Sequence, residues 1–195
     1  KVNDDILERN HRIVSNASCT TNCLAPIAQI LDQSFGIERG VMTTVHAYTN
    51  DQRLADVPHA DLRRSRAAAE NIIPTTTDAA RAVGIVLPQL VGKLDGIAAR
   101  VPIPDGSVVD LSVQLTKSAS REAINEAVQE AAAERFKGVV EYSEVPLVSS
   151  DIIGNPHSSV FDSLVTQSKD DGFCRILSLY DNEWGYSNRC VDLIT

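Results

Sequence analysis

A cysteine and its surroundings are the first place in this sequence where nucleophilic chemistry could be done. Cys19 stands at the start of an apolar pattern with helical spacing, and Ser18 occupies the position of a helix cap. A cysteine there lies near the positive end of the helix dipole and near free backbone N–H groups, which favour the thiolate. Those N–H groups could also hold an oxyanion formed on an attacked carbonyl. Spacing alone leaves a second interpretation open, a small buried core residue.

A histidine that could serve this thiol ends a β-rich run. His46 closes that run just before a long polar stretch, so it is well placed to act as a base, although a structural histidine fits equally well. Cys23 lies one helical turn after Cys19 and is interpreted as core. Neither Cys174 nor Cys190 is assigned to a site. The cysteines show no metal-binding spacing, so we predict no metal site.

Hydroxyl side chains gather in two places where they could hold phosphate oxygens. One group surrounds Cys19, and the other precedes a predicted short helix. The two groups are Ser18, Thr20 and Thr21, and Thr75, Thr76 and Thr77. Hydroxyls and free helix N–H groups suit phosphate, and Arg64 or Arg100 would add positive charge. The alternative is that the threonines only cap a helix and that the arginines are solvated.

Composition excludes several classes of protein. The chain has 195 residues, 43% of them hydrophobic and 23% charged, as in ordinary globular domains. The formal net charge of −8 gives no general attraction for nucleic acid. No apolar run approaches the length of a membrane span, and four cysteines without a disulfide pattern favour a reduced, cytoplasmic location.

The elements that must position these side chains alternate between strands and helices. Apolar spacing predicts helices from Cys19 to Phe35, from Asp78 to Leu87 and around residues 124–131. Strands are predicted at 12–15, 41–48, 94–103, 107–115, 138–142, 147–153, 158–166 and 173–180. The order predicts an α+β fold with a mixed, largely antiparallel sheet. Residues 49–71 are polar, which predicts a long functional loop.

One binding motif is missing from the sequence. No G-x-G-x-x-G follows a predicted strand, so the chain carries no recognisable dinucleotide-binding unit.

Several long motifs resemble the glyceraldehyde-3-phosphate dehydrogenase family. The run S-N-A-S-C-T-T-N-C-L-A-P at 15–26 resembles that family's active-site signature. Further matches are T-T-V-H-A-Y-T-N-D-Q at 43–52, D-L-R-R-S-R-A-A-A at 61–69, N-I-I-P at 71–74, R-V-P at 100–102, S-V-V-D-L at 107–111 and Y-D-N-E-W-G-Y-S-N-R at 180–189. The resemblance covers nearly the whole chain. It implies a catalytic domain whose helices cover one face of the sheet.

The resemblance also implies a reaction. Cys19 attacks the aldehyde carbon of glyceraldehyde 3-phosphate while His46 takes the proton. A hydride leaves to NAD, and inorganic phosphate then releases the thioacyl group as 1,3-bisphosphoglycerate. Thr49 and Arg100 match the site for the substrate's own phosphate, with Asp51 beside it. The attacking phosphate matches Ser18, Thr20, Arg64 and Thr77, and the nicotinamide matches Asn182 and Tyr186. The complete enzyme is expected to be a cytoplasmic homotetramer of glycolysis.

Residues 1–195 are expected to be the catalytic domain alone, without the family's N-terminal dinucleotide-binding domain or the final helix after Thr195. Such a domain should bind NAD poorly and turn over slowly. The sequence departs from the family at Asp78, where glycine is usual and a carboxylate would repel phosphate. Erythrose-4-phosphate dehydrogenase shares much of the pattern, but residues 46–51 fit the glyceraldehyde enzyme better.

Two other classes explain part of the same pattern. A hydrolase or acyltransferase would use Cys19 and His46 without a nicotinamide, which leaves Asn182 and the phosphate-like clusters without a role. A non-catalytic interaction module would use the loop at 49–71 to assemble with other subunits, and its Cys19 would be unreactive.

Overall fold

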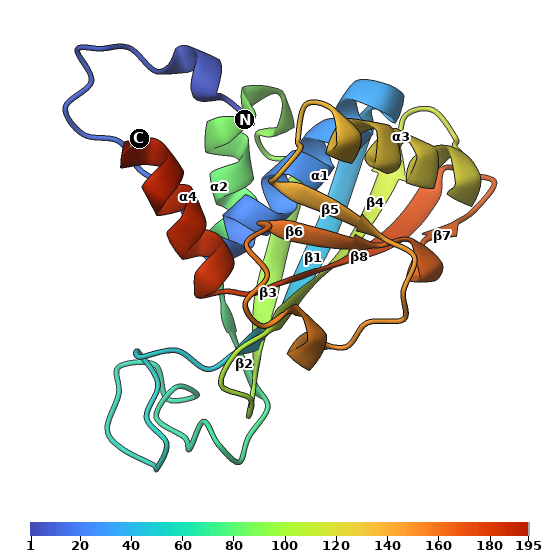
Figure 1. Cartoon of the computed structure of the whole chain (residues 1–195). Helices are drawn as coiled ribbons and strands as arrows, with labels where there is room; N and C mark the ends of the chain where they lie inside the picture. The colour runs from blue at the N-terminus through green and yellow to red at the C-terminus, as the bar shows by residue number, and fades with distance from the viewer. Residues whose placement is uncertain (195) are drawn as a thin grey trace.

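A single mixed sheet forms the centre of the protein. The computed structural model describes residues 1–194, and within them eight strands are ordered β2-β3-β1-β4-β8-β6-β5, with β7 paired to β8 (Figure 1). The strands are β1 (Ile37–Ala47), β2 (Ile73–Thr76), β3 (Leu94–Val101), β4 (Ser107–Leu115), β5 (Val140–Ser143), β6 (Ser159–Asp162), β7 (Gln167–Ser168) and β8 (Phe173–Tyr180). The pairs β1–β3 and β5–β6 are parallel and the others antiparallel. The predicted α+β class with a mixed, largely antiparallel sheet is therefore confirmed.

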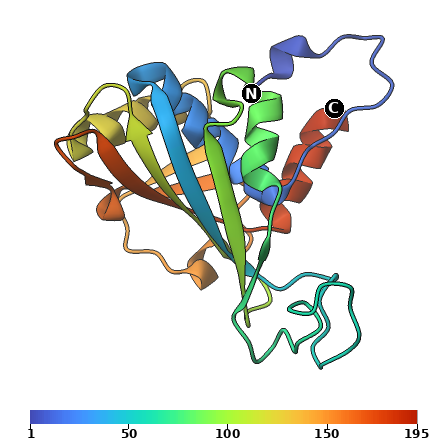
Figure 2. The same cartoon turned by 180° about the vertical axis from the view of Figure 1, so that it is seen from behind.

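Helices cover one face of this sheet. The four α-helices among the described residues are α1 (Cys19–Phe35), α2 (Ala79–Val86), α3 (Arg121–Ala133) and α4 (Trp184–Ile194). Figure 1 shows α1, α2 and α3 packed along one face, while Figure 2 shows the opposite face of β3, β1 and β4 uncovered. Side chains alternate between the two faces along each strand. In β1, Met42 and Thr44 point to the covered face and are buried, whereas Val41 points to the open face and is 62% exposed.

Helix α1 forms where its sequence predicts and fills the core. The Ser18 hydroxyl accepts a hydrogen bond of 3.0 Å from the Thr21 backbone N–H, which caps the helix. Gly36 ends it with a φ of +74°, a conformation that glycine adopts readily. Leu24 and Leu31 are almost fully buried, and each such side chain contributes about 1.5–3 kcal/mol of hydrophobic stabilisation.

The other two predicted helices are also present. Helix α3 presents Ile124 and Val128, both fully buried, to the core, and Ser120 caps its first turn. Helix α2 ends before Pro88. Pro26 lies inside α1 and is buried, and the helix continues past it to Phe35.

Two predicted strands are wrong. Residues 12–15 are exposed and contain no strand, because nothing pairs with their backbone. Within 147–153 the chain forms a 3₁₀ helix at Ser149–Ile152 instead. The Asp151 carboxylate accepts a hydrogen bond from the Val148 N–H, a local turn that competes with a strand. The strand predicted at 158–166 is confined to β6, and a 3₁₀ helix follows at Ser163–Val165.

Three elements were not predicted from the sequence, namely the strands β2 and β7 and the helix α4. Strand β2 is short and lies at the edge of the sheet beside β3. Helix α4 begins where the Asp181 carboxylate accepts hydrogen bonds from the N–H groups of Glu183 and Trp184. Further 3₁₀ turns lie at Asp4–Ile6 and Pro88–Leu90. None of the helices within residues 1–194 is both long and apolar enough to cross a membrane.

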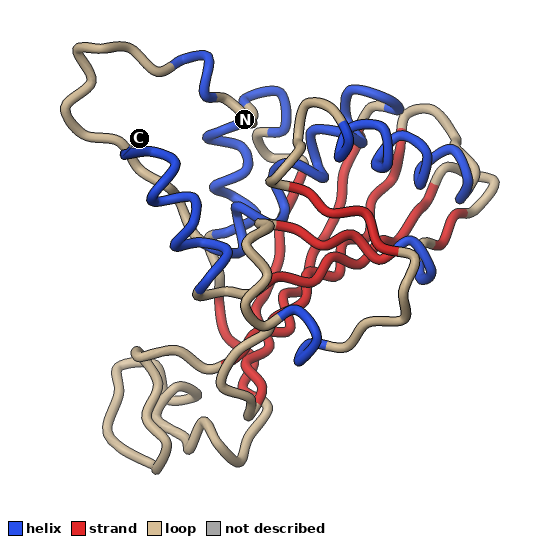
Figure 3. The backbone as a smooth tube through the Cα atoms, in the orientation of Figure 1, coloured by secondary structure: helices blue, strands red, loops and turns tan. Residues whose placement is uncertain are grey.

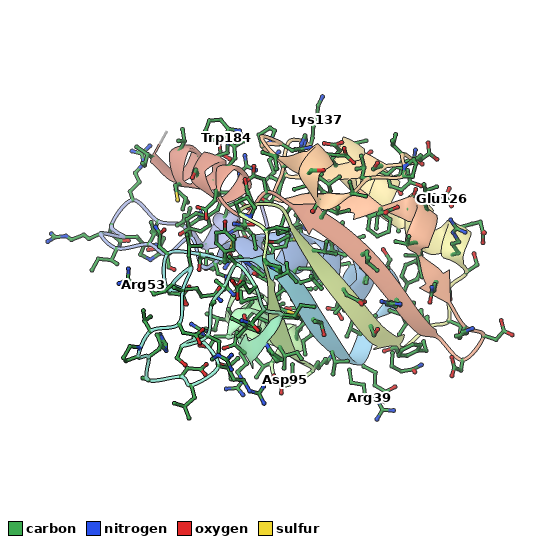
Figure 4. The ribbon with its side chains drawn as sticks, turned by 90° about the horizontal axis from the view of Figure 1, so that it is seen from below. Arg39, Arg53, Asp95, Glu126, Lys137 and Trp184 are labelled. Carbon is green, nitrogen blue, oxygen red and sulfur yellow. The ribbon has the colours of Figure 1, made fainter. Side chains whose placement is uncertain are left out.

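The polar stretch at 49–71 is a loop, as predicted. Figure 3 shows it without helix or strand, projecting beyond the end of the sheet. Seen from below, Arg53 of this loop and Trp184 at the start of α4 lie toward one end of the molecule, while Glu126 of α3 lies toward the other (Figure 4). The loop therefore extends from the sheet end where β1 finishes.

Candidate active site

Cys19 and His46 meet at the point where helix α1 begins and strand β1 ends. The Cys19 Sγ lies 3.5 Å from the His46 Nε2. The first residue of a helix and the penultimate residue of a neighbouring strand thus come together, although 27 positions separate them. This distance is close enough for a proton to move between the sulfur and the ring.

Burial controls the proton affinity of the Cys19 thiol. Burial raises the pKa of Cys19 above its ordinary value. Hydrogen bonds from the Thr20 hydroxyl and backbone N–H, together with the positive charge of Arg100, lower this pKa without overcoming the effect of burial, and Glu183 raises it further. The helix N-terminus alone therefore does not make Cys19 a thiolate in the free protein, and removal of its proton requires a base.

His46 is neutral and so can be that base. Burial, and then the charge of Arg100, lower the pKa of His46 to about 4. Its Nδ1 lies 2.7 Å from the Ala47 carbonyl oxygen and 3.0 Å from the Arg100 Nη1. The carbonyl requires Nδ1 to carry the proton, whereas the guanidinium, which only donates, requires Nδ1 to be bare. Only the first tautomer leaves Nε2 free to accept the Cys19 proton, so a ligand that draws Arg100 away favours the basic form.

Arg100 also joins His46 to the first residues of the loop. Its Nη1 donates to the Ala47 carbonyl at 3.1 Å and to the Thr49 hydroxyl at 3.3 Å. The Thr49 hydroxyl in turn donates to the Asp51 carboxylate. Partial burial raises the pKa of Asp51, but the Thr49 hydroxyl, Arg100 and Arg64 together lower it by more. The net pKa is therefore below the ordinary value, and the carboxyl group is an anion. Arg100 and Thr49, both predicted to bind substrate phosphate, are therefore in contact.

A second polar cluster surrounds Arg64 within the loop. The Arg64 Nη1 donates to the Asp51 carboxylate at 2.6 Å, and its Nε donates to the Thr75 hydroxyl of β2 at 2.9 Å. Asp61 lies 3.6 Å from the same guanidinium. Arg64 is only 23% exposed and already paired, so an incoming anion must compete with two carboxylates for it.

The remaining predicted phosphate ligands lie around the starts of α1 and α2. Ser18 is exposed and caps α1, while the Thr20 hydroxyl is buried and bonded to Tyr180 rather than open to solvent. The Thr77 hydroxyl accepts a hydrogen bond from the Ala79 N–H at the start of α2. Asp78, next to it, is exposed and makes no capping bond, so its carboxylate is free near any anion held there.

The two predicted nicotinamide residues lie near the same site. The Asn182 side-chain oxygen accepts 2.7 Å from the Ser107 hydroxyl, which itself accepts from the Ala47 N–H. The Asn182 amide nitrogen donates to Glu183 at 3.3 Å. Each amide atom keeps one further hydrogen-bonding position, which fits the carboxamide of a nicotinamide. Burial and then the neighbouring Cys190 raise the pKa of the Tyr186 phenol, and Cys19 is near enough to add a smaller contribution.

Sequence reasoning missed three residues of this site. Tyr180 and Thr44 are buried beneath the Cys19–His46 pair and are bonded to each other at 2.8 Å. Tyr180 follows the apolar pattern of a strand, so periodicity gave it no role beyond the core. Ala17 has a φ of +53°, which costs a non-glycine residue about 1–2 kcal/mol. This strained turn directs the chain into the cap of α1, and no residue type in the sequence indicates it.

Other ionisable groups within residues 1–194 form no further cluster suited to a metal: no three His, Cys, Asp or Glu side chains come together in that way. All four cysteines are free. Burial raises the pKa of Cys23 to about 12 and that of Cys174 to about 11, in keeping with the interpretation of Cys23 as core.

Comparison with known proteins gives a consistent family. Residues 18–182 match the model of the glyceraldehyde 3-phosphate dehydrogenase C-terminal domain. The chain is 61% identical over 194 residues to a glyceraldehyde-3-phosphate dehydrogenase of Mycobacterium tuberculosis, covering 100% of this chain and 57% of that protein. Similar enzymes from Borreliella burgdorferi and Streptomyces avermitilis are 60% and 56% identical, over 98% of this chain and 58% of each. The chain thus spans a little over half the length of these relatives.

Proposed function

The chain belongs to the glyceraldehyde-3-phosphate dehydrogenase family, and from that premise we propose that it is the catalytic domain of an NAD-dependent, phosphorylating aldehyde dehydrogenase of glycolysis. The observation that carries the proposal is the 3.5 Å approach of Cys19 Sγ to His46 Nε2, with Arg100 in contact with the same histidine. A nucleophile, a base and an anion-binding cation therefore lie within one connected site.

Cys19 forms the covalent intermediate. Its sulfur attacks the aldehyde carbon of glyceraldehyde 3-phosphate, the thiol proton passes to the neutral His46 Nε2, and His46 then gives this proton to the carbonyl oxygen, so that a hemithioacetal forms and His46 is neutral again. Asn182 and Tyr186 would hold the nicotinamide end of NAD, which would supply the acceptor for the hydride of this carbon. His46 removes the hydroxyl proton at the same time, and a thioester on Cys19 results. Phosphate oxygen then attacks the thioester carbon, the C–S bond breaks, and 1,3-bisphosphoglycerate leaves.

Two separate anion sites serve the two phosphates. Arg100 and Thr49 hold the substrate's own phosphate, supported by their mutual hydrogen bond beside His46. The attacking phosphate is held by Arg64 and Thr77 together with Ser18 and Thr20, of which Thr20 contributes backbone rather than its buried hydroxyl. Charge-assisted hydrogen bonds of this kind give an acidic protein local sites for anions.

Asn182 and Tyr186 contact the nicotinamide end of the cofactor. The free donor and acceptor positions on the Asn182 amide support this role. The sequence has no glycine-rich diphosphate loop, so these residues hold only one end of NAD. We therefore expect the chain alone to bind NAD weakly and to need a dinucleotide-binding domain for turnover.

The complete protein is proposed to be a cytoplasmic homotetramer. Free cysteines fit a reducing compartment. The uncovered face of the sheet carries Val41, Ile97 and Phe173, which are 62%, 53% and 42% exposed, and a neighbouring subunit could bury them. The loop at 49–71 would then reach a neighbour's cofactor pocket.

A half-reaction that needs no cofactor tests this proposal on the chain itself. When 1,3-bisphosphoglycerate is added, Cys19 should attack the acyl carbon, form a thioester and release inorganic phosphate. Mass spectrometry of proteolytic peptides locates the adduct, and Cys19→Ser serves as the variant without the nucleophile. A control reaction with an unphosphorylated activated ester measures general thiol reactivity.

The expected result is an adduct on Cys19 alone, with one phosphate released per chain. Adducts spread over all four cysteines, or faster reaction with the unphosphorylated ester, would contradict the proposal. The second of these results would instead indicate a cysteine hydrolase that has no use for the phosphate-binding residues.

A further inference from the structure

A buried tyrosine hydroxyl lies between the two elements that carry the proposed nucleophile and base. Tyr180, the last residue of β8, is 1% exposed. Its hydroxyl oxygen lies 2.8 Å from the Thr20 hydroxyl of α1 and 2.8 Å from the Thr44 hydroxyl of β1. Thr20 directly follows Cys19 in the first turn of α1, and Thr44 stands two residues before His46 on the same face of β1. Tyr180 therefore ties the turn that carries the thiol to the strand that carries the imidazole.

The tyrosine ring also contacts the base. The ring centroids of Tyr180 and His46 are 5.9 Å apart at an interplanar angle of 75°, an edge-to-face arrangement that favours one orientation of the imidazole. No other buried side chain described above touches the helix turn, the strand and the imidazole together. A phenylalanine ring would fill this space equally well, so packing alone does not account for the hydroxyl group of Tyr180.

Each hydroxyl in the group has a single proton, so the direction of one hydrogen bond sets the direction of the next. Hydrogen bonding by the Thr20 side chain lowers the pKa of the adjacent Cys19 thiol, so the sulfur is one possible acceptor of the Thr20 proton. When Thr20 donates to sulfur it can only accept from Tyr180, and Tyr180 in turn can only accept from Thr44. All the protons then point toward Cys19, and hydrogen bonds arranged in one direction strengthen one another.

We propose that Tyr180 is a positioning residue for the Cys19 thiol: its hydroxyl joins α1 to β1 and directs the Thr20 proton toward the sulfur. This inference rests on the proposed role of Cys19 as the nucleophile. Tyr180 does not contact substrate. It acts through Thr20, by stabilising the negative charge that develops on the sulfur when the proton leaves.

Other charged and titratable groups that face Cys19 act independently of this chain of hydrogen bonds. They are His46 from β1, Arg100 from β3, Glu183 before α4, Tyr186 from α4 and Cys23 from the next turn of α1. None of them is bonded to the Tyr180 hydroxyl among the described contacts. A change confined to that hydroxyl therefore leaves their positions and charges as they are.

The test is the pH dependence of alkylation of Cys19 by iodoacetamide in the 195-residue chain, with each cysteine followed by mass spectrometry. Tyr180→Phe removes only the hydroxyl and keeps the ring against His46. We expect Cys19 to react about three- to tenfold more slowly at neutral pH and its titration midpoint to rise. Thr20→Val should have the same effect, and Thr20→Ser, which keeps the hydroxyl, should restore the wild-type profile.

Tyr142→Phe provides the matched control. It removes the same hydroxyl from a ring that stacks on Phe161, 6.0 Å away, outside the site. The Cys190 alkylation rate, measured in the same samples, reports any general loosening of the fold. If Tyr180→Phe does not fold, Thr44→Val breaks the same chain of hydrogen bonds at its far end and is measured instead.

An unchanged Cys19 profile in Tyr180→Phe would overturn the inference and leave the proposed function standing. Equal changes at Cys19 and Cys190 would overturn it too, because they would show a structural role alone. An unreactive Cys19 in the wild-type chain, with Cys190 reactive, would instead count against the proposed function itself. Failure of both Tyr180→Phe and Thr44→Val to fold would assign the hydroxyl to folding and so contradict a positioning role.

Discussion

The site has two halves that differ in burial and in charge. Around Cys19 the groups are uncharged and largely buried: a half-buried thiol, a buried neutral imidazole and the buried hydroxyls of Thr20 and Tyr180. In the loop at 49–71 the groups are charged, partly exposed and paired, as in the Arg64–Asp51 ion pair. The sheet and α1 hold the first half, and only a loop holds the second.

In the proposed function, this difference separates proton transfer from anion binding. In the buried half, low polarity sets where protons reside, so substitutions there should change pH dependence and chemical rate. In the loop, charges are screened by solvent, so substitutions there should change affinity for anions and its dependence on salt. Arg100 connects the halves, because it touches His46 on one side and Thr49 on the other.

Loss of the proposed base, His46, should give the largest effect. In His46→Ala, transfer of the acyl group from 1,3-bisphosphoglycerate to Cys19 should slow by about 10²–10⁴-fold, the usual contribution of general acid–base catalysis. The rate is measured by quenched-flow mass spectrometry. His11→Ala, which removes an exposed histidine, is the control. Equal slowing in both variants would show that the buried half has no special role in proton transfer.

The buried imidazole should also make folding stability depend on pH. The folded pKa of His46 is about 4, below its ordinary 6.5, so the unfolded state binds more protons between these values. Stability is full above pH 6.5 and falls as the pH drops toward 4, by about 2–3 kcal/mol at pH 4.5. Urea unfolding at pH 7 and 4.5 should show this loss in the wild type and its absence in His46→Gln.

The loop carboxylates should behave differently in the same experiment. Hydrogen bonds and arginines lower the pKa of Asp51 and Asp61 below the ordinary 3.8. Any stability that they contribute is therefore lost only at still lower pH. A fall in stability between pH 6.5 and 4.5 that persisted in His46→Gln would contradict this division between the two halves.

Arg100→Ala should have an intermediate effect that depends on the substrate. Loss of charge-assisted hydrogen bonds worth about 1.5–3 kcal/mol should slow acylation by 1,3-bisphosphoglycerate about 10- to 100-fold. Acetyl phosphate has no second phosphate, so its reaction with Cys19 should slow much less. The substitution should also raise the pKa of His46, since Arg100 lowers it, and an NMR titration of the ring measures this shift. Equal slowing with both acyl phosphates would contradict the assignment of Arg100.

Arg64→Ala should have the smallest effect of the three alanine substitutions at the site. Because Arg64 is already paired with Asp51, we expect about a tenfold rise in the phosphate concentration that half-saturates release of the acyl group from Cys19. Phosphorolysis should suffer more than hydride transfer. Arg66→Ala removes an arginine that is 63% exposed and paired with Asp56, and it should behave as wild type. Similar losses in the two variants would mean that the loop acts only through its overall charge.

The sequence predicted the scaffold better than the fine geometry of the site. Helix α1 and its Ser18 cap follow from apolar spacing and cap chemistry, and the long strands follow from alternation. The motifs indicated Cys19 and His46, but only the register of the sheet brings them to 3.5 Å. The tautomer conflict at Nδ1 could not be predicted, because it depends on the position of the Arg100 side chain in space.

Local chemistry that competes with periodicity accounts for the errors. Residues 12–15 have strand-like composition but no partner strand, and Asp151 draws its neighbours into a 3₁₀ turn. Helix α4 was missed because its start depends on the Asp181 carboxylate, which caps it from within a polar run. Tyr180 fits the apolar pattern of a core strand because its ring is buried. The pattern does not show that its hydroxyl also forms hydrogen bonds.

The fate of the acyl group on Cys19 tests the central claim most directly. The chain is acylated with 1,3-bisphosphoglycerate, freed of excess reagent and divided between buffer with and without inorganic phosphate. The account predicts that phosphate speeds release of the acyl group in proportion to the fraction of phosphate sites that it occupies, and that 1,3-bisphosphoglycerate is regenerated. Without phosphate, the thioester should persist. Release at the same rate in both buffers, with 3-phosphoglycerate as the product, would show that water is the acceptor and would contradict the account.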